Sequence, residues 1–371
     1  MALHFLATMH EMSIEANEYS YSAAISALEK GGEWQLALWL LRQMCNHQLF
    51  PNEVTYGASI TSCARGGNWI AALGLLVELL DRGLQLNVIA TSAAITACEK
   101  ASQWQAAINL LKLMDKKMVD PDCICFSSAI SACEKSGCWE LALALLQGMN
   151  DSFLTPDTGT FNAGISACAV GGQWQMACDL LFAMPGLHVA PDMISFSAAI
   201  VACDKCERWT LALCLLQQSL LKSIRTDTVF LNSVLHSLES TNNWRTSLAL
   251  LRDMAGQDVL LNELSYRAVM GACQWLMAIA LWEEMCQVTG PSTISASTCI
   301  LVCAKQDEWQ AGLQLLQYML EEIGFPEGPS AFDALIHACD RKGCDSAANQ
   351  LLTQWNFKVT DLLGSYSTSG G

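Results

Sequence analysis

A nearly identical text occurs twice in the chain, as Ser26-Ala27-Leu28-Glu29-Lys30-Gly31-Gly32-Glu33-Trp34-Gln35-Leu36-Ala37-Leu38 and as Ser131-Ala132-Cys133-Glu134-Lys135-Ser136-Gly137-Cys138-Trp139-Glu140-Leu141-Ala142-Leu143. Tryptophan marks further copies, because it recurs at intervals of 35 residues, at positions 34, 69, 104, 139, 174, 209 and 244. Trp275 and Trp309 continue the series at intervals of 31 and 34. A fixed period of this length predicts an array of structural repeats.

Each repeat contains two series of apolar residues at helical spacing. When a repeat is counted from four residues before its recurring Tyr or Phe, the first series occupies positions 5, 9 and 12, as in Phe126, Ile130 and Cys133. The second series occupies positions 18, 21, 22, 25 and 28. A pair of small or polar residues such as Gly31-Gly32 separates them, and Pro precedes several repeat starts, where it cannot continue a helix. Each repeat is therefore predicted to be a helical hairpin.

This numbering divides the chain into a partial repeat, an array and a tail. Residues 1–16 match only the second helix of a repeat, residues 17–355 hold about ten repeats, and residues 356–371 form a short tail. The repeats begin near residues 17, 52, 87, 122, 157, 192, 227, 262, 292 and 328. Hairpins of this size bury their apolar faces only against their neighbours, which predicts an all-α, right-handed α-solenoid superhelix with first helices on the concave side. The eighth repeat lacks the turn before Trp275, and we expect a distorted hairpin there.

The composition limits the possible functions. Acidic residues number 36 and basic residues 20, and the net charge of −16 argues against general binding to DNA or anionic lipid. Hydrophobic residues make up 52% of the chain, which excludes intrinsic disorder. No apolar run reaches the roughly 18 residues of a membrane-spanning helix, and no targeting peptide is readable. We therefore expect no membrane partner.

The 18 cysteines do not follow a metal or disulfide pattern. Eight of them share position 12 of the repeat, where one small apolar side chain per hairpin is expected to pack: Cys63, Cys98, Cys133, Cys168, Cys203, Cys273, Cys303 and Cys339. Cys203 and Cys206 form an isolated CxxC, and the six histidines show no metal-ligand spacing. No phosphate loop, nucleophile elbow or carboxylate cluster is present. We predict no metal, no cofactor and no enzymatic activity.

Three repeat positions recur without a packing reason. Position 14 is basic in seven repeats: Lys30, Arg65, Lys100, Lys135, Lys205, Lys305 and Arg341. These cations form either a ladder for the phosphates of an extended single strand or a solvated face that shields the acid one residue earlier. Position 6 is small and polar in most repeats. Position 1 is Asn or Asp in the first eight repeats, where it either caps a helix or binds a ligand.

The repeat resembles the pentatricopeptide repeat, a helical hairpin of 35 residues, in its P-type form. The resemblance covers about residues 3–355 and is carried by segments such as PDCICFS at 121–127 and AISACEK at 129–135. The tetratricopeptide repeat fits less well, because its period is 34 and its aromatic residues lie in the first helix, whereas Trp opens the second helix here. The resemblance implies that the array reads single-stranded RNA, one base per repeat.

The resemblance also assigns roles to residues. In the family, residue 6 of one repeat and residue 1 of the next read a base together. The corresponding pairs are Ser22 with Asn52, Gly57 with Asn87, Ser92 with Asp122, Ser127 with Asp157, Asn162 with Asp192, Ser197 with Asp227, and Asn232 with Asn262. Their implied bases are A, weakly A, G, G, U, G and a pyrimidine, from 5′ to 3′. The base-sandwiching residues at position 3 are Val54, Ile89, Ile124, Ile194, Val229, Leu264 and Ile294. The phosphate-contacting lysine of the family falls on position 14.

Three functions fit this sequence. The first is sequence-selective, non-catalytic binding of single-stranded RNA, which acts in the processing, stability or translation of an organelle transcript. The alternative is an α-solenoid scaffold for a protein partner, because a net charge of −16 is unusual for an RNA binder. The third is an incomplete array without a function, as the damaged eighth repeat would suggest. The resemblance implies a mitochondrial or chloroplast location. We also expect RNA-processing proteins as further partners, and a monomer.

Overall fold

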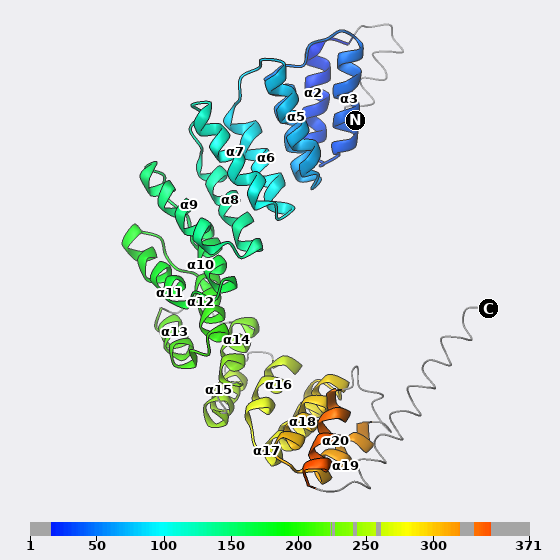
Figure 1. The fold of residues 1–371 in the computed structure, drawn as a ribbon, viewed down its shortest axis with the longest axis vertical. Coiled ribbons are helices and arrows are strands. Elements are labelled where there is room, and N and C mark those ends of the chain that lie inside the picture. Colours follow the sequence, from blue (N-terminus) through cyan, green and yellow to red (C-terminus); the bar gives the residue numbers. More distant parts are fainter. Residues whose placement is uncertain are drawn as a thin grey trace, which may run out of the picture. The chain divides into compact units, whose positions relative to one another are not determined.

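A computed structural model describes residues 16–222, 224, 227–239, 243–256, 261–319 and 330–342. Within these ranges every regular element is a helix and no strand occurs (Figure 1). The helices alternate as antiparallel hairpins, so the all-α solenoid of helix-turn-helix repeats predicted from the sequence is confirmed. The predicted partial repeat, apart from Ala16, and the tail at 356–371 lie outside the described residues, as does the second half of the tenth repeat.

Residues 1–202 form the first of two compact bodies. Its first helices are α2 (Glu18–Glu29), α4 (Glu53–Arg65), α6 (Val88–Lys100), α8 (Cys123–Ser136) and α10 (Thr158–Val170). Its second helices are α3 (Trp34–Asn46), α5 (Trp69–Asp81), α7 (Trp104–Lys116), α9 (Trp139–Asp151) and α11 (Trp174–Ala183), and the 3₁₀ turn η1 (Met184–Leu187) follows α11. Helix α12 (Met193–Lys205) crosses the boundary to the second body.

Residues 203–371 form the second body. Its described first helices are α14 (Thr228–Glu239), α16 (Glu263–Ala272), α18 (Thr293–Lys305) and α20 (Ser330–Arg341). Its second helices are α13 (Trp209–Leu221), α15 (Trp244–Gly256), α17 (Trp275–Val288) and α19 (Trp309–Tyr318). In both bodies every described second helix begins at the tryptophan whose recurrence predicted the repeat.

First helices of successive repeats pack directly against one another. In the first body α4 contacts α2 and α6, and α8 contacts α6 and α10; in the second body α16 contacts α14 and α18. A second helix packs on the first helix of its own repeat and of the next, as α5 packs on α4 and α6. Within each body the first helices therefore form a continuous row, which places equivalent residues of neighbouring repeats side by side.

The core of each hairpin consists of the apolar residues that the period marked out. Tyr56, Phe196 and Tyr266, all at position 5, are fully buried. The eight cysteines of position 12 are also buried, so their predicted packing role is confirmed. Burial raises the pKa of five of these thiols to about 11: Cys63, Cys98, Cys133, Cys168 and Cys273. These five thiols therefore stay neutral at physiological pH.

The eighth repeat keeps its hairpin with a shortened first helix. Helix α16 has 10 residues, and only Cys273 and Gln274 separate it from α17. The Gln306 side chain from the next repeat completes the shortened connection. Its Oε1 accepts from the Trp275 N–H at 3.0 Å, and its Nε2 donates to the Cys273 carbonyl at 3.0 Å. The expected distortion thus consists of a shorter first helix and a shorter turn, where a neighbouring repeat bonds two backbone groups.

Candidate nucleic-acid interface

Residue 1 caps the first helix in the first eight repeats. In eight repeats its side-chain oxygen accepts from the backbone N–H three residues later, at 2.8 to 3.0 Å: Asn17, Asn52, Asn87, Asp122, Asp157, Asp192, Asp227 and Asn262. Such caps stabilise a helix by about 1 kcal/mol. The capping alternative considered for this position is therefore confirmed. Capping needs only one side-chain oxygen, so it leaves the second polar atom of the Asn or Asp for another partner.

Residue 6 and the following residue 1 are in direct contact in two of the predicted pairs. Asn162 Nδ2 donates to Asp192 Oδ1 at 3.1 Å, and Asn232 Nδ2 donates to Asn262 Oδ1 at 3.1 Å. The residues of each pair lie 30 positions apart in the chain, and the packing of successive repeats brings them together. These two pairs form compact polar groups at the N-terminal ends of first helices.

The other residues at position 6 are smaller. The hydroxyls of Ser92 and Ser127 donate to the carbonyls of Ile89 and Ile124 in their own helices, each at 3.1 Å, and both serines stay partly exposed. Gly57 is buried and carries no side chain. The predicted pair of Ser197 with Asp227 takes one residue from each of the two bodies, which are described separately.

Residue 3 presents an apolar side chain to solvent in nearly every repeat. The seven residues predicted to sandwich bases are between 41% and 70% exposed: Val54, Ile89, Ile124, Ile194, Val229, Leu264 and Ile294. Tyr19 occupies the same position in the first repeat and is 85% exposed. Sequence reasoning missed Tyr19, although its distance from the repeat start would have identified it. A regular column of exposed apolar side chains contributes little to the core and is suited to contact with flat apolar surfaces.

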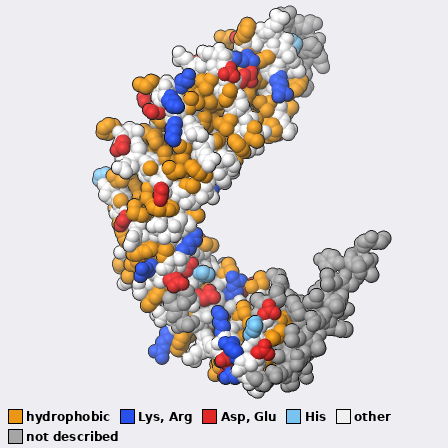
Figure 2. Space-filling model, in the orientation of Figure 1, with side chains coloured by type: hydrophobic (Ala, Val, Ile, Leu, Met, Phe, Trp, Pro, Cys, Tyr) orange, Lys and Arg blue, Asp and Glu red, His pale blue; other side chains and the backbone are white. Residues whose placement is uncertain are grey.

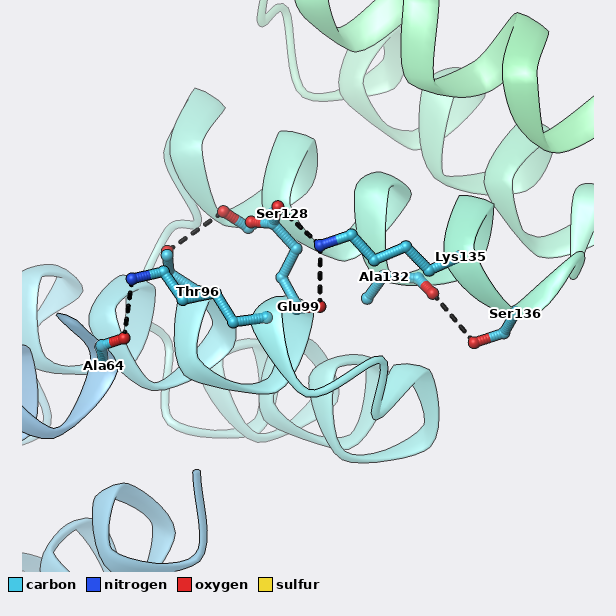
Figure 3. Close-up of polar contacts among 8 residues, drawn as sticks. Ala64, Thr96, Glu99, Ser128, Ala132, Lys135 and Ser136 are labelled. Atoms are coloured by element: carbon cyan, nitrogen blue, oxygen red, sulfur yellow. Dashed lines mark hydrogen bonds and ion pairs between the residues drawn. The ribbon is translucent and has the colours of Figure 1, made fainter. Parts of the chain in front are cut away.

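Several cations at position 14 bind backbone carbonyls of the preceding repeat. Lys135 Nζ donates to the Glu99 carbonyl at 3.1 Å (Figure 3). Equivalent bonds run from Arg65 to the Lys30 carbonyl at 3.4 Å, from Lys100 to the Ala64 carbonyl at 3.0 Å, and from Arg341 to the Ala304 carbonyl at 3.0 Å. These acceptors are the last carbonyls of a first helix, which lack intrahelical donors and lie at the negative end of the helix dipole.

The acids before these cations pair across the same boundary. Glu99 Oε1 lies 3.5 Å from Lys135 Nζ, and Glu29 Oε1 lies 4.0 Å from Arg65 Nη2. An acid at position 13 is thus neutralised by the cation of the next repeat and not by its own neighbour in sequence. The cationic side chains nevertheless remain 41% exposed at Lys135 and 49% exposed at Arg65. A phosphate at this column would therefore compete with carbonyl and carboxylate oxygens for the same cations.

The described part of the chain shows neither a cluster of metal ligands nor a membrane-spanning helix. No three His, Cys, Asp or Glu side chains in it lie close enough to hold a metal ion. Among the same residues, no helix has both the length and the apolar character needed to cross a bilayer.

Comparisons with known proteins bear on the family. A family model described as pentatricopeptide repeat-containing protein matches residues 1–114, and a PPR repeat model matches residues 124–152. No curated protein sequence gives a significant match.

Solved structures share the fold. The chain is similar to the pentatricopeptide repeat protein PPR10 in complex with an 18-nucleotide psaJ RNA element, with a TM-score of 0.75, 16% identity, and coverage of 94% of this chain and 52% of PPR10. A second structure, PPR10 from maize, gives a TM-score of 0.53 at 16% identity, with coverage of 96% and 61%. This chain thus spans about half the length of PPR10. The repeat text, the family models and the fold agree: residues 1–114 and 124–152 match pentatricopeptide repeat models, and the array shares the fold of pentatricopeptide repeat structures.

Proposed function

We propose that the array binds single-stranded RNA and selects its sequence. One observation carries this proposal, namely an exposed apolar residue 3 that recurs two positions after the polar residue 1 on the first helices. Val54, for example, is 63% exposed and follows the cap residue Asn52. Unstacked bases present apolar faces and polar Watson–Crick edges, so they match an array of alternating apolar and polar contacts.

The solved structure of PPR10, which has the same fold, supports RNA as the partner. PPR10 is described in complex with an RNA element, and the proposal extends that class of ligand to this chain. We propose the pairing of residues 6 and 1 as the base-reading groups, residue 3 as the base-sandwiching group and position 14 as the phosphate contact. The proposed role is non-catalytic and concerns the processing, stability or translation of a mitochondrial or chloroplast transcript.

The charge distribution favours selective contacts with the bases over strong electrostatic attraction to the phosphates. On the face seen in Figure 2, basic side chains are interspersed with acidic and apolar ones. Cations at position 14 also bind carbonyl oxygens within the fold, as Lys100 does. General attraction to polyanions is therefore weak, and discrimination rests on contacts with the bases.

Selection of bound RNAs from a random pool tests this proposal. The expected product is a motif that resembles A-A-G-G-U-G-pyrimidine, since this is the order implied by the seven pairs. Recovery of a different but reproducible motif would retain RNA binding and refute the assigned register. Failure to enrich any RNA with the folded protein would refute the proposed function.

A pair of substitutions in the apolar column gives a second test. Ile89→Ser with Ile124→Ser is expected to weaken RNA binding while the melting temperature stays near that of the wild type, because the two side chains are 70% and 57% exposed. Ile70→Ser with Val77→Ser provides the control, since these residues of α5 are 67% and 55% exposed but lie on a second helix. Equal loss of affinity in both double variants would contradict the assignment of position 3.

A protein-binding scaffold is the second candidate, and the net charge of −16 favours it. A pull-down that recovers one stable protein partner, together with crosslinking that recovers no RNA, would support the scaffold over the RNA binder.

A further inference from the structure

A third residue joins one of the two contacting pairs. Ser195, at position 4 of the repeat that begins with Asp192, is fully buried. Its Oγ donates to Asn162 Oδ1 at 2.5 Å, while its backbone N–H donates to Asp192 Oδ1 at 2.9 Å. A second contact of the hydroxyl, to Asp192 Oδ1, is longer at 3.0 Å. A hydroxyl donates one hydrogen, so the shorter contact with Asn162 takes it.

The same arrangement recurs in the second body. Ser265 is fully buried, and its Oγ donates to Asn232 Oδ1 at 2.7 Å. Its backbone N–H donates to Asn262 Oδ1 at 3.0 Å, while Asn232 Nδ2 donates to that same oxygen at 3.1 Å. Each body thus contains one network of this kind, formed by residue 6 of one repeat and by residues 1 and 4 of the next repeat.

The serine accompanies asparagine at position 6. Both pairs with Asn at position 6 have Ser at the following position 4, whereas the four pairs with Ser at position 6 have Thr55, Cys125, Thr160 and Phe230 there. The hydroxyls of Thr55 and Thr160 donate to the caps Asn52 and Asp157, at 2.8 and 2.6 Å. Among the described contacts, a hydroxyl at position 4 donates to the side chain of residue 6 only in the two pairs with an amide at position 6.

The network selects one of the two orientations of the amide. In the observed orientation Asn162 Oδ1 faces the Ser195 hydroxyl, and Nδ2 faces the carboxylate of Asp192. A 180° flip would place Oδ1 against the carboxylate and leave the Ser195 hydroxyl with only its longer contact to Asp192 Oδ1. The fixed amide keeps one Nδ2 hydrogen and one Oδ1 lone pair for a ligand.

We propose that Ser195 and Ser265 are positioning residues that set the base preference of their repeats by fixing the orientation of Asn162 and Asn232. This inference rests on the proposed function, because it concerns the same RNA-reading site. The ligand at these two repeats is a base whose edge offers an acceptor beside a donor, as uracil does.

Substitution of Ser195 by Ala tests the inference. The variant is expected to lose roughly two- to tenfold of the preference for U over the other bases at the fifth nucleotide of A-A-G-G-U-G-pyrimidine, the effect of one neutral hydrogen bond. Preferences at the other six nucleotides stay unchanged. Ser195→Thr, which retains the hydroxyl, is expected to keep the preference for U. Thr55 and Thr160 show that this buried position accommodates threonine.

Ser295→Ala is the matched control. Ser295 occupies position 4 and is fully buried, but its hydroxyl donates to the Ser292 carbonyl at 3.0 Å and contacts no described residue at position 6. It should reproduce any general loss of stability without a change in base preference. Ser265→Ala repeats the test at the seventh nucleotide.

The outcomes separate the two proposals. Wild-type selectivity in both Ser195→Ala and Ser265→Ala would overturn the positioning role and leave RNA binding intact. Absence of RNA binding by the wild-type protein would overturn both the proposed function and this inference.

Discussion

At the residue scale, the turn between the two helices of a repeat depends on position 16, which has a positive φ angle. Four repeats place glycine there, with φ between 65° and 75°: Gly32, Gly67, Gly137 and Gly172. Three repeats place another residue in the same conformation, with φ between 56° and 60°: Ser102, Glu207 and Asp307. A side chain in this left-handed region costs about 1 kcal/mol, so these three turns retain strain that glycine would relieve.

Ser102→Gly is therefore expected to stabilise the protein by about 1 kcal/mol. The neighbouring change Ala101→Gly provides the control, because Ala101 has a φ of −90° and gains nothing from the freedom of glycine. It should destabilise the protein by about 0.5 kcal/mol. Urea unfolding midpoints of the two variants measure both effects, and a shift in the same direction would contradict the argument.

The buried thiols predict a loss of stability at alkaline pH. Folding raises the pKa of Cys98 and Cys133 from 9.0 to about 11, because burial disfavours the thiolate. A raised folded-state pKa contributes stability below pH 9, and this contribution is lost as the pH rises toward 11. We expect the melting temperature, measured by circular dichroism of the helices, to fall progressively between pH 9 and pH 11.

The double variant Cys98→Ala with Cys133→Ala isolates the effect of the thiols. It lacks two of the titrating groups, so its melting temperature should depend less on pH between 9 and 11 than that of the wild type. Identical pH profiles for the two proteins would show that other groups cause the alkaline loss.

At the scale of the helix, the end of one element is stabilised by a side chain from the next repeat. Cations such as Lys135 bind the final carbonyls of the preceding first helix, and Gln306 does the same for the shortened connection of the eighth repeat. Both interactions cross from one hairpin to the following one. They explain how a hairpin with an incomplete turn remains part of the array.

Gln306→Ala should destabilise the second body by about 1 to 2 kcal/mol, since it leaves the Trp275 N–H and the Cys273 carbonyl without this partner. Gln274→Ala is the control, because Gln274 precedes the same helix but its side chain makes no capping bond. Thermal unfolding compares the two, and equal losses would contradict a bridging role for Gln306.

The sequence predicted the helices and their buried faces because both depend on local periodicity. Every described second helix starts at the recurring Trp, and the cysteines of position 12 are buried as expected. Contacts between repeats were harder to predict from the sequence. The bond from Ser195 to Asn162 spans 33 residues, and its existence depends on how two hairpins pack. The sequence showed which residue types recur, but it did not show that a cation at position 14 binds the carbonyls of the preceding repeat.

At the scale of the whole molecule, the limited number of basic side chains sets an upper limit on the salt dependence of RNA binding. Single-stranded RNA loses affinity with a slope of about −0.7 on a log–log plot for each phosphate neutralised. The seven cations of position 14 then limit the slope to about −5. Affinities measured from 50 to 500 mM salt test this limit, and a clearly steeper slope would show that further basic residues contact RNA.

Replacement of Lys30, Lys100, Lys135 and Lys205 by Ala should flatten this slope by up to about 3 and lower the affinity at physiological salt. Lys112, Lys116 and Lys117 are exposed basic residues in and just after the second helix α7, and their replacement serves as the control. Wild-type affinity in the quadruple variant would rule out phosphate contacts by this column.

The capping of one repeat by the next gives the array a direction. An internal first helix gains a side-chain donor for its last carbonyls only when the following hairpin has docked, as the Glu99 carbonyl, which also accepts from the Ser102 N–H, does from Lys135. During synthesis from the N-terminus, each new hairpin would therefore add this side-chain bond to the one before it and lack the equivalent bond at its own end. Growth of the folded array is in this sense vectorial. Its free end is where a partly made chain is most exposed to proteases and chaperones.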